Sequence, residues 1–424
     1  MDSKDLESSP HALPHLDGPA LDGPALGAPR SPIRTPEAAP SSGLRLRGAD
    51  LAELVSFMER AGHPAYRARQ IFQWVYQKGA QDFEGMTNLP KELRAWLREN
   101  VALGGMRRIE IVGRSRETQK IVFQTDDGEF VESVLMRDED DADGADGADG
   151  AKARGTSIGR GAGAAPPVRP PARNAQAARV SLCVSSQIGC PLNCRFCLTG
   201  FGGFRRDLRV DEITGQLIEA RRVIAPDERI ASVVFMGMGE PMLNLRAVIP
   251  ALDLYTSPEA LDVPGRRITV STAGVVPGID ELARSGVEAN LAVSLNATTQ
   301  ETRDRAMPAL RKWPIPELLD ACRRFPLSAR RRITFEYVLL DGVNDAPADA
   351  RRLIRLLHGI PSKVNLICYN PDDRLGFRPA NEEKAEAFRA ALSKANYAVS
   401  LRRSKGRRYQ AACGQLAAHF TRGK

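Results

Sequence analysis

The feature that most constrains the fold is a regular alternation of strand-like and helix-like segments that begins at Val180. Six short apolar segments follow one another, separated by longer amphipathic stretches, and they read VSLCVSS, ASVVFM, RRITVST, NLAVSL, RRITFEYVLL and KVNLICYN. This alternation predicts βα units, in which parallel strands form one sheet and helices cover its outer side. Because eight units close a full barrel, six units predict an α/β fold with a partial (βα)6 barrel and a site at the carboxyl ends of its strands.

A helical unit is expected before the barrel. The segments ADLAELVSFMERAG and AYRARQIFQWVYQKG carry apolar residues at helical spacing, which predicts a helical accessory domain over residues 46–104. In the second segment, Arg67 and Arg69 lie beside aromatic residues. This pattern suggests an RNA-contacting face, and an apolar core stripe next to a solvated basic face is the alternative.

Three alternating segments then predict strands, and they read RRIEIVGR, TQKIVFQT and EFVESVLM. An Asp-Asp-Gly turn at residues 126–128 separates the last two segments. Residues 105–137 are therefore expected to form a β-hairpin extension that leads to the core. Residues 180–424 make up the barrel and a C-terminal segment that contains Cys413.

Two regions have compositions that do not favour a packed structure. Residues 1–45 are rich in Pro, Gly, Ala and Ser and are expected to be a disordered tail. Residues 138–179 begin with an Asp/Gly/Ala repeat and end in Pro, Arg and Ala. This low-complexity insert is expected to form a surface loop between two strands.

Charge and cysteine content narrow the functional classes. The 60 Lys and Arg residues outnumber the 52 Asp and Glu residues, which gives a net charge of +8 and a pI of about 9.2. This balance favours a polyanionic partner, although an Arg-rich surface alone gives the same number. The seven cysteines are odd in number and partly clustered, unlike a secreted disulfide framework. The sequence shows no signal peptide and no apolar run of about 20 residues, so we expect a cytoplasmic protein that does not enter a membrane.

The clearest indication of a metal-binding site comes from Cys190, Cys194 and Cys197. Their C-x3-C-x2-C spacing has no fourth cysteine or histidine nearby. Three thiolates can hold three corners of a [4Fe–4S] cluster and leave the fourth iron open to a ligand that is not protein. A zinc site completed by a distant fourth cysteine is the alternative.

A glycine-rich turn follows the second strand of the predicted barrel, in the run FMGMGEP. Gly239 lets the backbone approach a ligand closely, and the Glu240 carboxylate can accept hydrogen bonds from an ammonium group. An ordinary strand-to-helix turn is the alternative interpretation.

Seven motifs are spread from about residue 50 to residue 418, and they read YRARQIFQWVYQKG, FEGMTNLP, CVSSQIGCPLNCRFC, MGMGEPMLN, VSTAGVVPGI, EYVLLDGVND and AACGQL. In these motifs and in their order, the chain resembles the RlmN/Cfr family of radical S-adenosylmethionine (SAM) RNA methyltransferases. The resemblance is closer to the RlmN branch than to the Cfr branch. Only the two low-complexity regions lie outside it.

The resemblance implies that the three cysteines hold a [4Fe–4S] cluster and that SAM binds its open iron. The residues implied to contact SAM are Gly239, Glu240, Ser271, Ser294, Leu295, Asn296 and Asn370. The sequence departs from the family's pattern at one of these positions, because Asn296 stands where the Ser-Leu pair is normally followed by His. An amide can donate and accept hydrogen bonds but cannot carry a cationic proton.

The resemblance also implies three catalytic residues. Cys413 corresponds to the cysteine that receives a methyl group from one SAM. Glu132 corresponds to the proton acceptor, and Cys183 to the thiol that releases the product by forming a disulfide with Cys413. Without the resemblance, Glu132 would be interpreted as an exposed strand carboxylate and Cys183 as a buried strand residue. Cys322 and Cys368 are expected to be small buried residues.

The implied function is methylation of C2 of adenosine in 23S rRNA, in the peptidyl-transferase region, and in tRNA, 3′ of the anticodon. The implied partners are these RNAs and an electron-donating reductase such as flavodoxin, and a monomer is expected. The motifs leave two alternatives open. One is methylation of adenine at C8, as in the Cfr branch, and the other is a non-catalytic RNA-binding protein that carries an Fe–S cluster.

Overall fold

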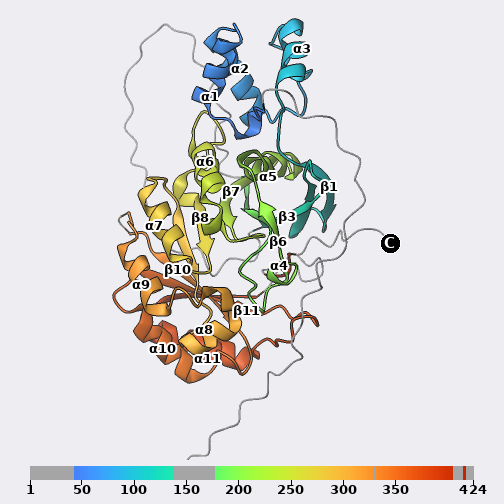
Figure 1. The fold of residues 1–424 in the computed structure, drawn as a ribbon. Helices are drawn as coiled ribbons and strands as arrows, with labels where there is room; N and C mark the ends of the chain where they lie inside the picture. Colours follow the sequence, from blue (N-terminus) through green and yellow to red (C-terminus); the bar gives the residue numbers. More distant parts are fainter. Residues whose placement is uncertain (1–42, 138–176, 329, 404–413, 417–424) are drawn as a thin grey trace, which may run out of the picture. The chain divides into compact units, whose positions relative to one another are not determined.

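A ten-stranded mixed β-sheet runs through the protein (Figure 1). The computed structural model describes residues 43–137, 177–328, 330–403 and 414–416. Within these residues the strands follow one another across the sheet in chain order, as β1 (Arg107–Val112), β2 (Gln119–Gln124), β3 (Phe130–Arg137), β4 (Ala178–Cys183), β7 (Glu228–Phe235), β8 (Ile268–Thr272), β9 (Asn290–Ser294), β10 (Ile333–Leu339), β11 (Ser362–Cys368) and β12 (Ala398–Arg402). A separate two-stranded ladder consists of β5 (Gln187–Gly189) and β6 (Phe204–Asp207).

The parallel part of the sheet confirms the expected fold class. Strand β4 and the strands from β7 to β12 are parallel to one another. The first six of them coincide with the six segments expected from the sequence, which makes the fold an α/β partial barrel. In the described residues the sheet is open, with β1 and β12 at its edges. Strand β12 was not expected, because its side chains are exposed or half-buried and do not form a buried apolar run.

Helices connect the parallel strands and pack against one another along the sheet (Figure 1). They are α4 (Leu198–Phe201), α5 (Val210–Val223), α6 (Leu245–Thr256), α7 (Val276–Arg284), α8 (Gln300–Ala306), α9 (Ile315–Arg324), α10 (Pro347–Leu357) and α11 (Glu382–Lys394). Contacts join α5 to α6, α6 to α7, α7 to α9, and α10 to α11. None of the helices in the described ranges is long and apolar enough to cross a membrane.

The two faces of the parallel sheet differ in polarity. Side chains alternate between the faces of a strand. One face carries Ser271, Ser294, Glu336 and Asn365 on four consecutive strands, β8 to β11, and Glu336 is paired with both Ser294 and Asn365. The opposite face carries buried apolar residues such as Phe335. The polar face is the one available for binding.

A helical region precedes the sheet and consists of η1 (Leu46–Gly48), α1 (Leu51–Arg60), α2 (Ala65–Tyr76) and α3 (Lys91–Asn100). Asp50 caps α1 by accepting a hydrogen bond from the backbone N–H three residues further on, at 2.7 Å. Hydrogen bonds and ion pairs join this region and the residues just after it to α5. The N–H of Gly105 donates to Asp211 Oδ2 at 2.8 Å, and Thr214 Oγ1 donates to the carbonyl oxygen of Arg47.

The β-extension is a three-stranded antiparallel unit of β1, β2 and β3. The expected turn joins β2 to β3, and Gly128 in it has a φ of 81°, which glycine adopts without strain. Strand β3 pairs antiparallel with β4, with Arg137 opposite Val180. The extension therefore continues the main sheet, and the two ends of the segment 138–179 lie side by side.

Candidate active site

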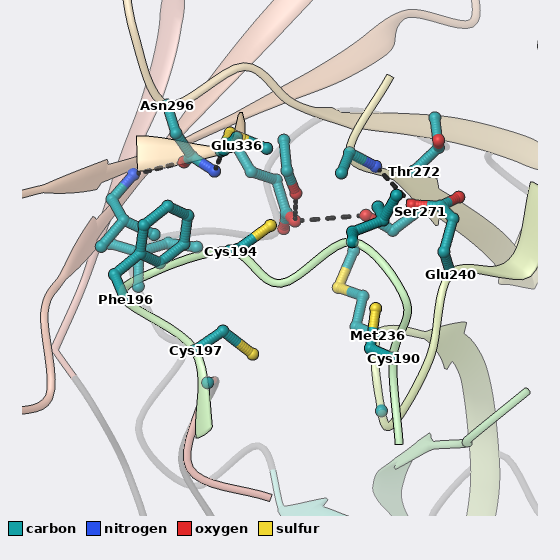
Figure 2. A pocket seen from close by; sticks show the side chains of 18 of the residues that line it. Cys190, Cys194, Phe196, Cys197, Met236, Glu240, Ser271, Thr272, Asn296 and Glu336 are labelled. Atoms are coloured by element: carbon teal, nitrogen blue, oxygen red, sulfur yellow. Dashed lines mark hydrogen bonds between the residues drawn. The ribbon is translucent and has the colours of Figure 1, made fainter. Parts of the chain in front are cut away.

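A pocket lies at the carboxyl ends of strands β7 to β11 (Figure 2). This is the edge of the sheet at which a βα fold places its chemistry. The sequence-predicted site residues that line the pocket are Cys190, Cys194, Cys197, Gly239, Glu240, Ser271, Ser294, Asn296 and Asn370. In the described residues, Glu132, Cys183 and Leu295 are not part of this lining.

Three thiols face the pocket from the segment that joins β5 to α4 (Figure 2). Cys197 N–H donates to Cys194 O at 3.0 Å, and Cys190 N–H donates to Gly203 O at 3.1 Å, which fixes the segment. Burial raises the pKa of the Cys190 thiol to about 12 and that of the Cys194 thiol well above its usual value. Among the described side chains, no group of three or more His, Cys, Asp or Glu residues is placed to hold a single metal ion.

The glycine-rich turn after β7 places Glu240 in the pocket wall. Gly239 has a φ of 98°, and a Cβ there would lie 2.5 Å from the Cβ of Gln187, so only glycine fits. The Gln187 side chain accepts a hydrogen bond from Glu240 N–H at 2.8 Å. The buried Glu240 carboxylate accepts hydrogen bonds from the N–H groups of Met242 at 3.1 Å and Ala273 at 2.8 Å. Burial raises the pKa of Glu240 to about 7, so a neighbouring charge can change its protonation near neutral pH.

Glu336 is a second buried carboxylate of the pocket; it begins the motif EYVLLDGVND but was not among the predicted site residues. Ser271 Oγ donates to its Oε2 at 3.4 Å (Figure 2). Ser294 Oγ donates to the same oxygen at 3.2 Å, and Asn365 donates to its Oε1 at 3.4 Å. Four neighbouring strands thus contribute one polar side chain each to this cluster. The available sequence signal was a single carboxylate that interrupts the apolar segment RRITFEYVLL.

Glu132 is buried on β3, so its interpretation as an exposed strand carboxylate is wrong. Its side chain is 1% exposed and forms an ion pair with the buried Lys120 of β2, with 3.0 Å between Nζ and Oε1. Cys183 lies on the adjacent strand β4, opposite Val134, and therefore on the same face of the sheet as Glu132.

Comparison with known proteins establishes the family. Residues 44–103 match the family described as "Ribosomal RNA large subunit methyltransferase N-terminal domain", and residues 184–354 match the Radical SAM superfamily. The dual-specificity RNA methyltransferase RlmN of Geobacter sulfurreducens is 44% identical over 88% of this chain and 91% of its own length. The chain belongs to the RlmN family of radical SAM RNA methyltransferases.

Two further relatives of the RlmN-family chain agree with this assignment. The dual-specificity RNA methyltransferase RlmN of Geotalea uraniireducens is 40% identical over 88% of this chain and 96% of its own length. The crystal structure of a radical SAM methyltransferase from Sphaerobacter thermophilus shares 38% identity and has a TM-score of 0.77. It covers 88% of this chain and 99% of its own.

Radical SAM enzymes use a [4Fe–4S] cluster and SAM, and the pocket of this family member fits both groups. The three thiols surround one hollow without converging on a single point, as the corners of a cluster require (Figure 2). The thiols release their protons when they bind iron. The carboxylates and hydroxyls of the polar sheet face can bind the amino-acid and nucleoside parts of SAM.

Asn296, the departure from the family's pattern, is tied to the backbone around it. Its φ of 54° lies in the left-handed region, which asparagine tolerates better than most residues. Its Oδ1 accepts a hydrogen bond from Val338 N–H at 2.9 Å, and its carbonyl oxygen accepts one from Asn344 Nδ2 at 2.8 Å. The side-chain amide oxygen is therefore occupied by a hydrogen bond to the backbone at the end of β10. Leu295 beside it is fully buried, and its N–H donates to the carbonyl oxygen of Glu336 at 3.0 Å.

Cys413 lies outside the described residues, so the structure does not describe its expected disulfide with Cys183. Gly414, the next residue in the chain, lines the pocket, and its carbonyl oxygen accepts a hydrogen bond from Leu198 N–H at 2.8 Å. Leu416 packs with Cys183 in a small buried cluster. This short C-terminal segment thus contacts both the cysteine segment and the sheet face that carries Cys183.

The remaining two described cysteines have different environments. Cys322 on α9 is buried, as expected, and burial raises its pKa to about 12. Cys368 at the end of β11 is only half-buried and lines the pocket, so the expectation of a small buried residue is wrong for it.

Proposed function

We propose that this chain methylates C2 of adenosine in 23S rRNA, in the peptidyl-transferase region, and in tRNA, 3′ of the anticodon. The observation that carries the proposal is that the three cysteines and Gly414, the residue next to Cys413, line the same pocket. Relatives with 40–44% identity are named dual-specificity RNA methyltransferases, which supports two classes of RNA substrate.

The proposed cofactor ligands come from both walls of the pocket. Cys190, Cys194 and Cys197 hold the cluster, and Glu240 receives the ammonium group of SAM. The other proposed SAM contacts are Gly239, Ser271, Ser294, Leu295, Asn296 and Asn370. When bound, these groups supply one-electron cleavage of a sulfonium and a methyl donor. Burial raises the pKa of Glu240 to about 7, which favours its neutral form. An ammonium group bound beside it stabilises the charged carboxylate instead.

The proposed catalytic residues are Cys413, Glu132 and Cys183. Cys413 carries the methyl group as a thioether. Glu132 takes the proton from the adenine ring carbon, a role that suits a carboxylate held in its charged form by Lys120. The Cys183 thiolate then attacks the Cys413 sulfur, so that an S–S bond forms as the bond from that sulfur to the nucleotide-bound carbon breaks. The contact of Leu416 with Cys183 supports this approach.

The helical unit over residues 46–104 is proposed to contact RNA. Tyr66 is 51% exposed, and the guanidinium of Arg67 lies over its ring at 4.7 Å from the centroid. An exposed ring with a stacked cation suits unpaired bases and phosphates. Phe72 and Tyr76 on the same helix are buried, so these two aromatic residues belong to the core stripe.

The wider setting is proposed from the same family resemblance. The proposed domain boundaries are 1–45, 46–104, 105–137, 138–179 and 180–424. We propose a cytoplasmic monomer that receives electrons from a reductase such as flavodoxin.

Substitution of Cys413 by alanine tests the proposal. Cys413→Ala is expected to abolish methyl transfer to RNA, because no thiolate is left to carry the methyl group, while the cluster remains. Purified variant and wild-type protein would be loaded anaerobically and incubated with SAM, a reductant and transfer or ribosomal RNA. Digested RNA would then be compared with C2- and C8-methyladenosine standards by mass spectrometry.

The matched control is Cys183→Ala, which keeps the methyl carrier and removes only the releasing thiol. It is expected to accumulate a covalent protein–RNA adduct. C2-methyladenosine from the Cys413 variant would contradict the methyl-carrier role. C8-methyladenosine from the wild type would instead identify the Cfr-type reaction, and absence of any 5′-deoxyadenosine would favour a non-catalytic Fe–S protein.

A further inference from the structure

Arg303 on α8 is a cation enclosed in the interior of the protein. It is 0% exposed and is the largest fully buried side chain among the described residues. In this part of the chain, no carboxylate lies within ion-pair distance of its guanidinium. The adjacent Asp304 is 28% exposed; its carboxylate accepts a hydrogen bond from Gln300 at 2.6 Å and lies 3.9 Å from Arg311. Burial lowers the pKa of Arg303 to about 10, which leaves it charged near neutral pH.

The guanidinium donates to backbone carbonyl oxygens. Nη1 donates to Leu310 O at 3.3 Å and to Trp313 O at 2.7 Å, and Nη2 donates to Ala273 O at 3.2 Å. The Nε is buried without a hydrogen-bond partner in the described residues. Carbonyl dipoles solvate a positive charge but do not neutralise it. The charge of Arg303 therefore acts on its surroundings through an interior of low dielectric constant.

Arg47 is a second buried arginine of the same protein, and its charge is paired with a carboxylate. It is 3% exposed, donates to Ala80 O at 3.0 Å, and lies 3.5 Å from the carboxylate of Glu219. The charge of Arg47 is thus balanced by a neighbour, whereas that of Arg303 is not. Arg47 belongs to the contact between the N-terminal helical region and α5.

Contacts place Arg303 next to the lining of the pocket and its helix next to the cysteine segment. Ala273, which accepts a hydrogen bond from Arg303, lines the pocket. Ala306, on the same short helix, accepts a hydrogen bond at 2.9 Å from the N–H of Arg195, which belongs to the cysteine segment.

We propose that Arg303 is the buried counter-charge of the [4Fe–4S] site formed by Cys190, Cys194 and Cys197, and that it raises the reduction potential of the cluster. This proposal rests on the proposed function, because it requires the [4Fe–4S] cluster. Reduction moves one electron from a low-potential donor to the cluster and adds one negative charge to a site that already holds three thiolates. A fixed cation stabilises the more negative state, and net charge near a cluster is a determinant of its potential. Arg303 needs no contact with the substrate to act in this way.

The test is a redox titration of the anaerobically reconstituted full-length protein without SAM or RNA, followed by electron paramagnetic resonance. Wild type would be compared with Arg303→Met, Arg303→Lys and the matched control Arg47→Met. At the potential that half-reduces the wild type, the ratio of reduced to oxidised cluster is expected to fall at least tenfold in Arg303→Met. A tenfold fall corresponds to a shift of 59 mV to more negative potential for one electron. Arg303→Lys and Arg47→Met are expected to titrate close to the wild type.

An unchanged potential in Arg303→Met, or an equal shift in Arg47→Met, would overturn the proposal. If Arg303→Met does not assemble a cluster, Arg303→Gln and Arg303→Lys are compared instead, and equal potentials in this charge-differing pair would overturn it. A wild type that forms no [4Fe–4S] cluster would overturn the proposed function together with this proposal. Unchanged potentials in a cluster-containing series would leave the proposed function standing.

Discussion

At the scale of single residues, the ion pair between Lys120 and Glu132 is the most consequential interaction outside the pocket. Both side chains are almost completely buried, so the pair places two opposite charges in contact away from water. The ionised carboxylate of such a pair is the form that can take a proton, which is the role proposed for Glu132.

Removal of the cation is therefore predicted to destabilise the fold. Lys120→Met takes the ammonium group away from the buried Glu132 carboxylate, and the broken buried ion pair is expected to lower the free energy of unfolding by about 3 kcal/mol at neutral pH. Urea unfolding would measure this loss. Lys120→Arg, which keeps a cation at this position, is the control and is expected to lose less stability. A Lys120→Met variant as stable as the wild type would contradict this role of the ion pair.

Local sequence predicted the residues of the site that lie in one motif and missed those that depend on packing. Cys190 to Cys197 form a continuous run whose spacing alone indicates a metal centre. Glu336 and Arg303 carry no such pattern, because a charge in a strand or in a short polar helix normally faces solvent. They are buried only because neighbouring strands and the loop after α8 enclose them.

At the scale of elements, Arg206 joins three parts of the structure that lie far apart in the sequence. It lies on β6 and contacts Asp127 in the β2–β3 turn at 2.7 Å and Glu212 on α5 at 2.8 Å. The hydrogen bond from Arg206 holds the pKa of Asp127 well below its usual range. This interaction fixes the β-extension against the ladder that supports the cysteine segment.

The contribution of Asp127 is predicted to depend on pH with a definite sign. Because its pKa is lowered in the folded protein, the ion pair stabilises the fold above the usual carboxyl value of 3.8, and this stability is lost as the pH falls below that value. Asp127 is about half exposed, so solvent screening limits the expected loss in Asp127→Asn to about 1 kcal/mol near neutral pH. Urea unfolding of wild type and variant would show a difference that shrinks toward acid. Glu129→Gln in the same turn is the control, and a difference that grows in acid would contradict the assignment.

Strand prediction succeeded for the strands that contain apolar runs and failed for β12 and for the short ladder of β5 and β6. Strands β4 and β7 to β11 were expected because their buried residues form apolar runs such as ASVVFM. Strand β12 contains only two large apolar residues, Val399 and Leu401, and both are half-buried. Its place beside β11 is set by pairing with a neighbour, which single-segment periodicity does not report.

At the scale of the whole molecule, the segment 138–179 interrupts a pair of strands that are already adjacent. Arg137 and Val180 face each other across β3 and β4. The connection between them can therefore be short without altering the sheet.

Replacement of residues 138–177 by a turn of about five residues is predicted to leave RNA methylation unchanged and to stabilise the fold. The connection becomes about eightfold shorter, or about three doublings, and each doubling of loop length costs about 0.6 kcal/mol of closure entropy, which gives about 2 kcal/mol. Urea unfolding and methylation assays would measure both properties. A variant with a Gly/Ser segment of the original length is the control. A folded short-turn variant that no longer methylates RNA would show that the segment takes part in the reaction.

The strict chain order of the ten sheet strands bears on how the protein is made. Each new strand joins beside the one synthesised before it, so no strand has to insert between two partners that have already paired. The sheet can grow as the polypeptide leaves the ribosome, with one free edge advancing at a time. The pocket behaves differently, because its lining extends from Cys190 to Gly414. A nascent chain thus acquires its framework gradually, but completes the lining of its pocket only after residue Gly414 has been added.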